Sequence, residues 1–110
     1  MGRFLTDFIG KKYGNTWIVH EPLRYEVKKG DIIEVPVDFE TDLASVPRGF
    51  WNIFPKDGLW TPAAVLHDYL YSKKLRSRAE CDKIFLEAME SLKVGWFRRH
   101  TMYRAVRMFG

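Results

Sequence analysis

Helical patterning begins in the stretch at residues 61–71, which reads TPAAVLHDYLY. Thr61 suits a helix N-cap, and Pro62 suits the first helical position because it lacks an N–H that would need a partner. Apolar and aromatic side chains then recur at helical spacing. The resulting stripe consists of Ala63, Leu66, His67, Leu70 and Tyr71. The stretch therefore predicts a helix with one face in the core.

Two more helices are expected downstream. Ser77 and Glu80 have the spacing of a capping box, and a third helical pattern runs from about Trp96 to Phe109. The single cysteine, Cys81, excludes an internal disulfide and is expected to be buried. The apolar stripe of the middle helix consists of Cys81, Ile84, Phe85, Ala88, Met89 and Leu92.

Strand patterning dominates the first half of the chain. Residues 17–19 and 24–27 are rich in aromatic and branched side chains, and residues 29–31 are typical of a hairpin turn. The run after this turn alternates apolar and polar side chains as far as residue 39, and Pro36 within it indicates an edge strand or a bulge. Residues 10–15 are expected to form a loop.

Strands followed by helices predict an α+β fold, with a small antiparallel sheet packed on about three C-terminal helices. With 110 residues, of which 46% are hydrophobic, the chain is expected to be a single domain. Its expected parts are a β-rich region over 1–45, a connecting loop with an aromatic patch over 46–60 and a helical region over 61–110. A large multi-step enzyme is excluded.

The composition also limits the partners. The net charge of +4 is modest, and acidic residues are interspersed among the basic ones, so nucleic acid is not the expected partner. No stretch approaches the roughly 20 apolar residues that cross a bilayer, so no membrane span is expected. The chain is therefore expected to be made as a soluble cytoplasmic protein.

A candidate metal site comes from the helical half. His67 and Asp68 are adjacent on one helix and point about 100° apart, and Asp68 is expected to reach toward the next helix, which carries Asp82. One nitrogen and two carboxylates suit zinc, manganese or iron. His67, Asp68 and Asp82 are therefore predicted to bind a divalent metal, zinc or manganese. The alternative is a hydrogen-bonded core histidine without a ligand.

A second polar segment, TDLASVPR at residues 41–48, follows the last predicted strand. Polar side chains within apolar sequence at such an exit are typical of groups presented to a cavity. Asp42 and Ser45 are therefore candidate catalytic residues with His67 and Asp68, and the candidates for substrate binding are Thr41, Arg48 and Tyr71. The alternatives are that Asp42 and Ser45 cap a turn and that Arg48 forms a structural ion pair.

A serine hydrolase arrangement is also open. Ser45 would be the nucleophile and His67 the base, with Asp42, Asp68 or Asp82 orienting the ring. It ranks below the metal site because the chain has no Gly-x-Ser-x-Gly segment.

An aromatic patch precedes the first helix and consists of Phe50, Trp51, Phe54 and Trp60. It is expected to cover the site or to dock a partner, and the alternative is that it supplies apolar area to a small core.

Together these segments resemble a phage and prophage family catalogued as domain of unknown function 1353. The likeness covers nearly the whole chain from about Trp17. The family's Thr-Asp-x-Ala-Ser-x-Pro segment, His-Asp pair and later Asp match Thr41, Asp42, Ala44, Ser45, Pro47, His67, Asp68 and Asp82. Val37-Asp38 and Cys81 depart from the pattern, and neither departure affects a candidate ligand. The resemblance implies a bacteriophage or prophage setting.

Two functions are predicted from these observations. The first is a small phage-encoded hydrolase, metal-dependent or polarising water directly, that acts on cell-wall peptide or a phosphorylated small molecule. The second is a non-enzymatic virion or tail assembly component that docks other phage structural proteins through the aromatic patch. The protein is expected to be synthesised in the host cytoplasm, and under the second function it would be virion-associated.

Overall fold

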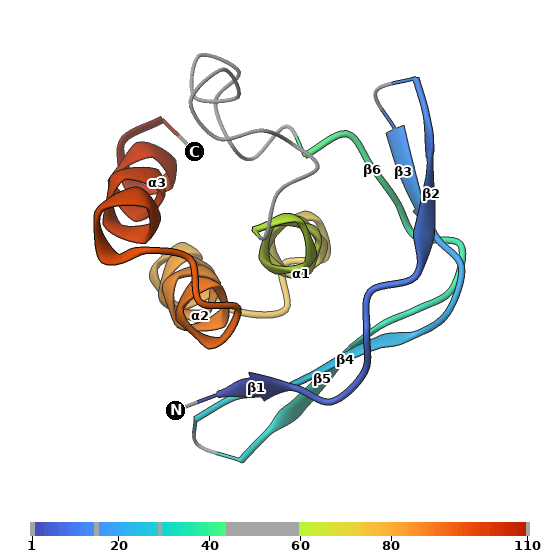
Figure 1. Cartoon of the computed structure of the whole chain (residues 1–110), viewed down its shortest axis with the longest axis horizontal. Coiled ribbons are helices and arrows are strands. Elements are labelled where there is room, and N and C mark those ends of the chain that lie inside the picture. Colours follow the sequence, from blue (N-terminus) through green and yellow to red (C-terminus); the bar gives the residue numbers. More distant parts are fainter. Residues whose placement is uncertain (1, 15, 29, 44–59, 110) are drawn as a thin grey trace.

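The computed structural model describes residues 2–14, 16–28, 30–43 and 60–109. Strands occupy the first half and helices the second, which confirms the predicted α+β class (Figure 1). The elements are β1 (Arg3–Phe4), β2 (Gly10–Tyr13), β3 (Thr16–Val19), β4 (Leu23–Glu26), β5 (Ile32–Val35), β6 (Glu40–Thr41), α1 (Thr61–Ser72), α2 (Arg78–Ser91) and α3 (Trp96–Phe109).

The described strands form two three-stranded antiparallel sheets instead of the one sheet expected. Their orders are β1-β4-β5 and β2-β3-β6. The second sheet contains β2, which lies in the region predicted as a loop: Gly10 pairs with Val19 and Lys12 with Trp17. Lysines and glycine have low strand propensity, so pairing with β3 decides the conformation here.

The β4–β5 hairpin follows the prediction. Leu23 pairs with Val35, and the turn contains Gly30 at a φ of 102°, which glycine adopts without strain. Pro36 follows β5 directly, and β5 is an outer strand of its sheet, as Pro36 indicated. The strand ends at Val35, earlier than the alternation predicted, because residues 36–39 turn toward β6.

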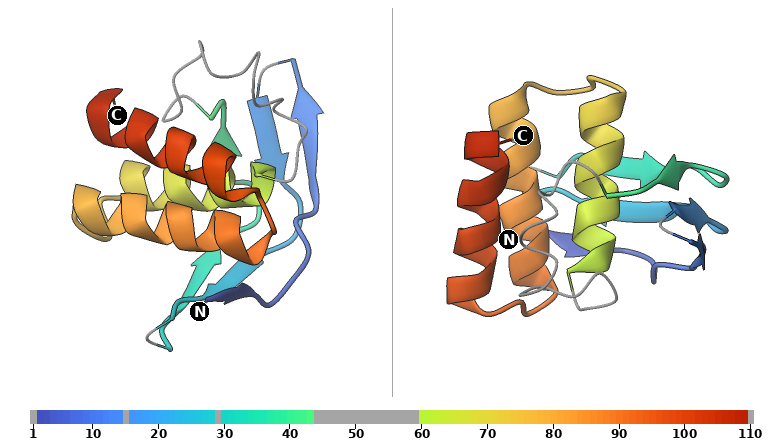
Figure 2. Two further views of the ribbon diagram at one scale, coloured as in Figure 1. Left: turned by 60° about the vertical axis from the view of Figure 1, so that its left-hand side comes forward. Right: turned by 90° about the horizontal axis from the view of Figure 1, so that it is seen from above.

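Helix α1 lies between the strands and the other two helices (Figures 1 and 2). Its N-cap residue is Trp60, and Thr61, the expected N-cap, is instead the first helical residue. At α2 the prediction is confirmed, because the Ser77 hydroxyl accepts a hydrogen bond from the Glu80 N–H at 3.2 Å. The cysteine of this helix, Cys81, is buried as expected.

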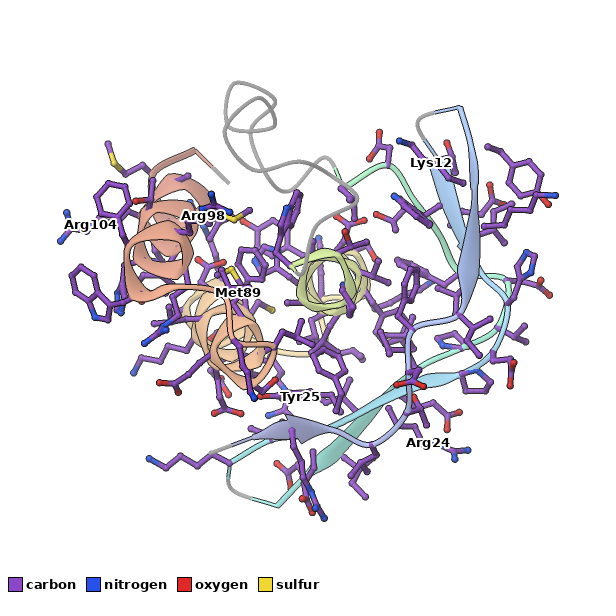
Figure 3. The ribbon with its side chains drawn as sticks, in the orientation of Figure 1. Lys12, Arg24, Tyr25, Met89, Arg98 and Arg104 are labelled. Atoms are coloured by element: carbon purple, nitrogen blue, oxygen red, sulfur yellow. The ribbon has the colours of Figure 1, made fainter. Side chains whose placement is uncertain are left out.

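Tyr25 fastens the first sheet to α2. It is directed from β4 toward the helices, on the opposite side of the strand from Arg24 (Figure 3). Its hydroxyl donates to Glu87 Oε1 at 2.6 Å, and the Lys28 N–H donates to the same oxygen at 3.1 Å. Burial and this carboxylate raise the pKa of Tyr25. Gly2 packs against the pair so closely that a Cβ on it would overlap both side chains.

Candidate functional site

His67 lies on the inward face of α1 and is 1% exposed. The helical stripe that predicted a buried face therefore carries the imidazole into the core. The ring stacks on Tyr71, with ring centroids 5.4 Å apart, and packs at a tilt against Phe85 of α2 at 4.8 Å. These two rings restrict the rotation of the imidazole, so the direction of its nitrogens is set by packing.

Asp82 of α2 completes a buried polar pair with this histidine. Its Oδ1 lies 2.7 Å from His67 Nε2, and both side chains are 1% exposed. Its Oδ2 accepts a hydrogen bond of 3.0 Å from Nη1 of Arg107, which approaches from α3. One carboxylate thus joins all three helices. We refer to His67, Asp82 and Arg107 as the buried triplet, in which His67 and Asp82 are buried and the Arg107 side chain is 39% exposed.

The pKa of Asp82 reflects opposing effects. Burial acts to raise it, but the hydrogen bonds from His67 and Arg107, together with their charges, outweigh burial and hold the pKa below its ordinary value. Asp82 is therefore ionised at neutral pH and only accepts hydrogen bonds. Nε2 of His67 must then carry a hydrogen, so in the neutral ring Nδ1 is the basic nitrogen.

This arrangement has a chemical meaning. In nucleophile–His–Asp triads a buried carboxylate fixes the tautomer of the histidine and stabilises the imidazolium that forms during reaction. The His67–Asp82 pair has the same division of roles with the two ring nitrogens exchanged. The His67–Asp82 pair can therefore orient a general base whose proton-accepting atom is Nδ1.

Asp68 points away from this pair, contrary to the expectation that it reaches toward α2. Its Oδ2 accepts a hydrogen bond from the hydroxyl of Thr41 on β6, and the same hydroxyl accepts from the Leu43 N–H at 3.0 Å. The rotation of about 100° between successive helical residues sends His67 and Asp68 to different neighbours. Thr41, predicted to bind substrate, is buried and joins α1 to the end of β6.

The predicted metal ligands therefore divide between two places. His67 and Asp82 are bonded to each other, while Asp68 is bonded to Thr41. Among the residues that the structure describes, no group of three or more His, Cys, Asp or Glu side chains is placed to hold a metal ion. The three residues do not fit a common metal site in this arrangement, and a zinc or manganese ion stays a prediction from the sequence.

Some of the remaining candidate residues lie within the described part of the chain and others lie outside it. Tyr71 is half-buried against the imidazole, and Asp42 is exposed just after β6. Trp60, a member of the predicted aromatic patch, is 3% exposed and belongs to the core, so its position does not support docking. The candidates that lie outside the described residues are Ser45, Arg48, Phe50, Trp51 and Phe54.

Arg107 is the member of the site that the sequence did not reveal. Helical periodicity places it on the flank of α3, beside the buried Val106, but it does not show which acidic group a long side chain reaches. The only signal was the presence of a cation at the edge of a buried stripe. That signal is common to Arg99, which instead pairs with Glu90 at 3.5 Å.

Comparison with known proteins shows what this chain is similar to in sequence. A family model described as "Protein of unknown function (DUF1353)" matches residues 17–106. The uncharacterized protein y4jT of Sinorhizobium fredii is 33% identical over 78 residues, which cover 69% of this chain and 23% of that relative. The chain thus corresponds to about a quarter of that relative's length. No solved structure matches the chain significantly. No described helix is long and apolar enough to cross a membrane.

Proposed function

Because this chain belongs to the DUF1353 family, whose description specifies no activity, we propose a function from its geometry: a small hydrolase in which His67 is the general base. The observation that supports the proposal is the 2.7 Å hydrogen bond between His67 Nε2 and an ionised, fully buried Asp82. A solvated surface pair would not restrict the tautomer in this way. Burial strengthens the orienting effect because the local dielectric constant is low.

In the proposed reaction, Nδ1 of His67 removes a proton from the attacking hydroxyl, which belongs either to water or to Ser45. The oxygen attacks a carbonyl or phosphoryl centre, and the imidazolium returns the proton to the leaving group. Asp82 stabilises the imidazolium, and Arg107 holds Asp82 in position. Asp42, Ser45 and Arg48 are proposed to position the substrate.

Two substrate classes suit this chemistry. Cell-wall peptide and a phosphorylated small molecule both present an electrophilic centre that a base-activated hydroxyl can attack, and a bacteriophage setting suits the first. No step is assigned to a metal, since the three predicted ligands do not converge.

The rival function is docking of phage structural proteins through the aromatic patch. Trp60 is the one member of that patch in the described part of the chain, and its indole is buried. Docking through this patch therefore has less support than base catalysis by His67.

The test is hydrolysis of p-nitrophenyl acetate, p-nitrophenyl phosphate and purified cell-wall sacculi by the wild type and by His67→Ala. General base catalysis contributes about 10²–10⁴-fold, so the variant should lose at least about a hundredfold of the rate. Added imidazole should restore part of it in His67→Ala. The control is His20→Ala, which removes an exposed histidine, and it should retain the full rate.

Parallel labelling with a fluorophosphonate identifies the nucleophile. Loss of labelling in Ser45→Ala would assign the nucleophile to Ser45, and turnover without labelling would assign it to water. If the wild type hydrolyses none of the three substrates, or if His67→Ala is folded and equally active, the proposal is wrong. The buried triplet is then an internal brace.

A further inference from the structure

Helix α3 lies on the outside of the helical layer. Figures 1 and 2 show the helices in the order α1, α2, α3, with α3 farthest from the strands. Its inner side is buried through Met102, Ala105 and Val106. On the outer side, Arg104 is directed away from the rest of the molecule (Figure 3).

Large apolar side chains are exposed on this helix. Among the described residues, the three most exposed large hydrophobic side chains all belong to α3: Phe97 is 74% exposed, Met108 72% and Trp96 63%. The Trp96 ring packs on the His100 ring, with centroids 4.6 Å apart, which restricts its motion. Single exposed apolar residues are ordinary, but several on one helix indicate an interaction surface.

The spacing of these residues is that of a helix–helix seam. Phe97, Thr101, Arg104 and Met108 follow one another at intervals of four, three and four residues, and they form a stripe that we call the outer stripe. The Thr101 hydroxyl donates a hydrogen bond to the Phe97 carbonyl at 2.7 Å, so this polar group needs no partner from outside. The outer stripe therefore suits the packing of a second helix.

The charge on α3 has one sign. The helix contains four arginines and no acidic residue. Arg99 and Arg107 are paired with carboxylates of α2, at 3.5 Å and 3.0 Å. Among the described residues, the exposed Arg98 and Arg104 have no ion pair or side-chain hydrogen bond. An occupant of the outer stripe would therefore be attracted to α3 if it carried carboxylates.

Three other occupants suit the outer stripe less well. A membrane that took up Phe97 and Met108 would also draw in Arg104, which lies between them, and a charge in hydrocarbon is costly. A second copy of α3 would bring more arginines and no carboxylate. Nucleic acid is bound through many phosphate contacts, whereas only two arginines of α3 lack an ion pair among the described residues. Aromatic side chains, methionine and arginine are the types enriched at protein–protein interfaces.

We propose that the outer stripe docks an amphipathic helix of another protein, whose apolar seam is flanked by carboxylates. Phe97 and Met108 pack on the seam, the aliphatic part of Arg104 lies along it, and the guanidinium pairs with a flanking carboxylate. A helix of 14 residues is about 21 Å long, so the interface is small and the complex is weak and transient. The proposal does not depend on the hydrolase chemistry.

The experiment titrates the full chain with two synthetic helices in a calorimeter. The acidic probe is three copies of the heptad Glu-Ile-Ala-Ala-Leu-Glu-Lys, and the basic probe is three copies of Lys-Ile-Ala-Ala-Leu-Lys-Glu. Both have the same apolar seam and differ in the charge that flanks it. The acidic probe should bind at least about tenfold more tightly than the basic one. In NMR spectra it should shift the amide signals of residues 97–108 and leave those of β4 unchanged.

Substitutions in the outer stripe locate the binding. Phe97→Ser and Arg104→Glu should each weaken binding of the acidic probe at least about tenfold. The matched controls are Leu75→Ser and Lys83→Glu, which change an exposed apolar residue and an exposed cation outside α3, and both should bind as the wild type does. The four variants should have the circular dichroism spectrum of the wild type, because each replaced side chain is exposed.

Several results would overturn the proposal. They are no binding of the acidic probe at millimolar concentration, equal affinity for the two probes, or an affinity that Phe97→Ser leaves unchanged. Phosphatidylglycerol vesicles, oligo(dT) and self-association of the chain are measured in parallel. If one of these interactions is lost in Phe97→Ser while the acidic probe does not bind, the outer stripe belongs to lipid, nucleic acid or a second copy, and the proposal is wrong.

Discussion

Replacing Asp82 by Ala should destabilise the protein more than any surface change. The substitution removes two charge-assisted hydrogen bonds, of 2.7 Å to His67 and 3.0 Å to Arg107. It also leaves a buried imidazole without its acceptor. Removing one partner of a buried ionic group costs about 3–5 kcal/mol of unfolding free energy. At roughly 4 °C per kcal/mol for a domain of this size, the melting temperature should fall by about 12–20 °C.

Urea denaturation followed by circular dichroism measures this loss, with Glu90→Gln as the control. Glu90 is a half-exposed carboxylate on the same helix that pairs with Arg99 at 3.5 Å. Exposed ion pairs contribute about 0–1 kcal/mol, so the control should lose less than about 1 kcal/mol. The denaturant slope should be the same in all three proteins if both variants unfold cooperatively.

The pH dependence tests the electrostatic origin of the effect. The pKa of Asp82 is lower in the folded than in the unfolded protein, so its ionisation stabilises the fold fully above the unfolded pKa, near 4. This contribution is lost as the pH falls through the folded pKa. The stability difference between the wild type and Asp82→Asn should therefore be large at pH 7 and shrink below about pH 4. A loss no larger than that of Glu90→Gln, or a difference that stays constant on acidification, would refute this reasoning.

Two further substitutions test the contacts around the core. Gly2→Ala places a Cβ against the hydrogen-bonded pair of Tyr25 and Glu87, and should cost about 1–3 kcal/mol by overpacking. Thermal denaturation measures it, and a variant as stable as the wild type would show that the pair moves aside freely. Thr41→Val removes the hydroxyl that joins β6 to Asp68 and should cost about 1–3 kcal/mol, because buried polar groups lose their partner. Asp68→Asn, which keeps an acceptor for that hydroxyl, should cost less in the same urea titration.

The sequence was sufficient for the helices because each has a strong local signal. The stripe containing His67 and the capping box at Ser77 both appear where predicted. The strands were harder, since β2 has little propensity of its own and depends on pairing with β3. Pairing between segments is a tertiary interaction, and a local pattern does not contain it.

Only part of the site could be predicted, because the rest also depends on tertiary interactions. The burial of His67 and its proximity to Asp82 follow from two apolar stripes that must face each other. The direction of the Asp68 side chain does not follow from these stripes. Periodicity determines the angle between neighbouring side chains, but not the side on which the next helix packs. The contact between Arg107 and Asp82 depends on how the third helix packs and on the conformation of a long flexible side chain. Local periodicity determines neither of these.

The bond between Tyr25 and Glu87 joins residues 62 positions apart in the chain. A growing polypeptide emerges from the ribosome N-terminal end first, and β4 is therefore complete well before α2 exists. Until then the apolar side of the first sheet lacks the contacts that α2 provides, and the part that α1 does not cover is open to chaperones or to other nascent chains. The strands made first thus reach their final packing only after the second helix has been made.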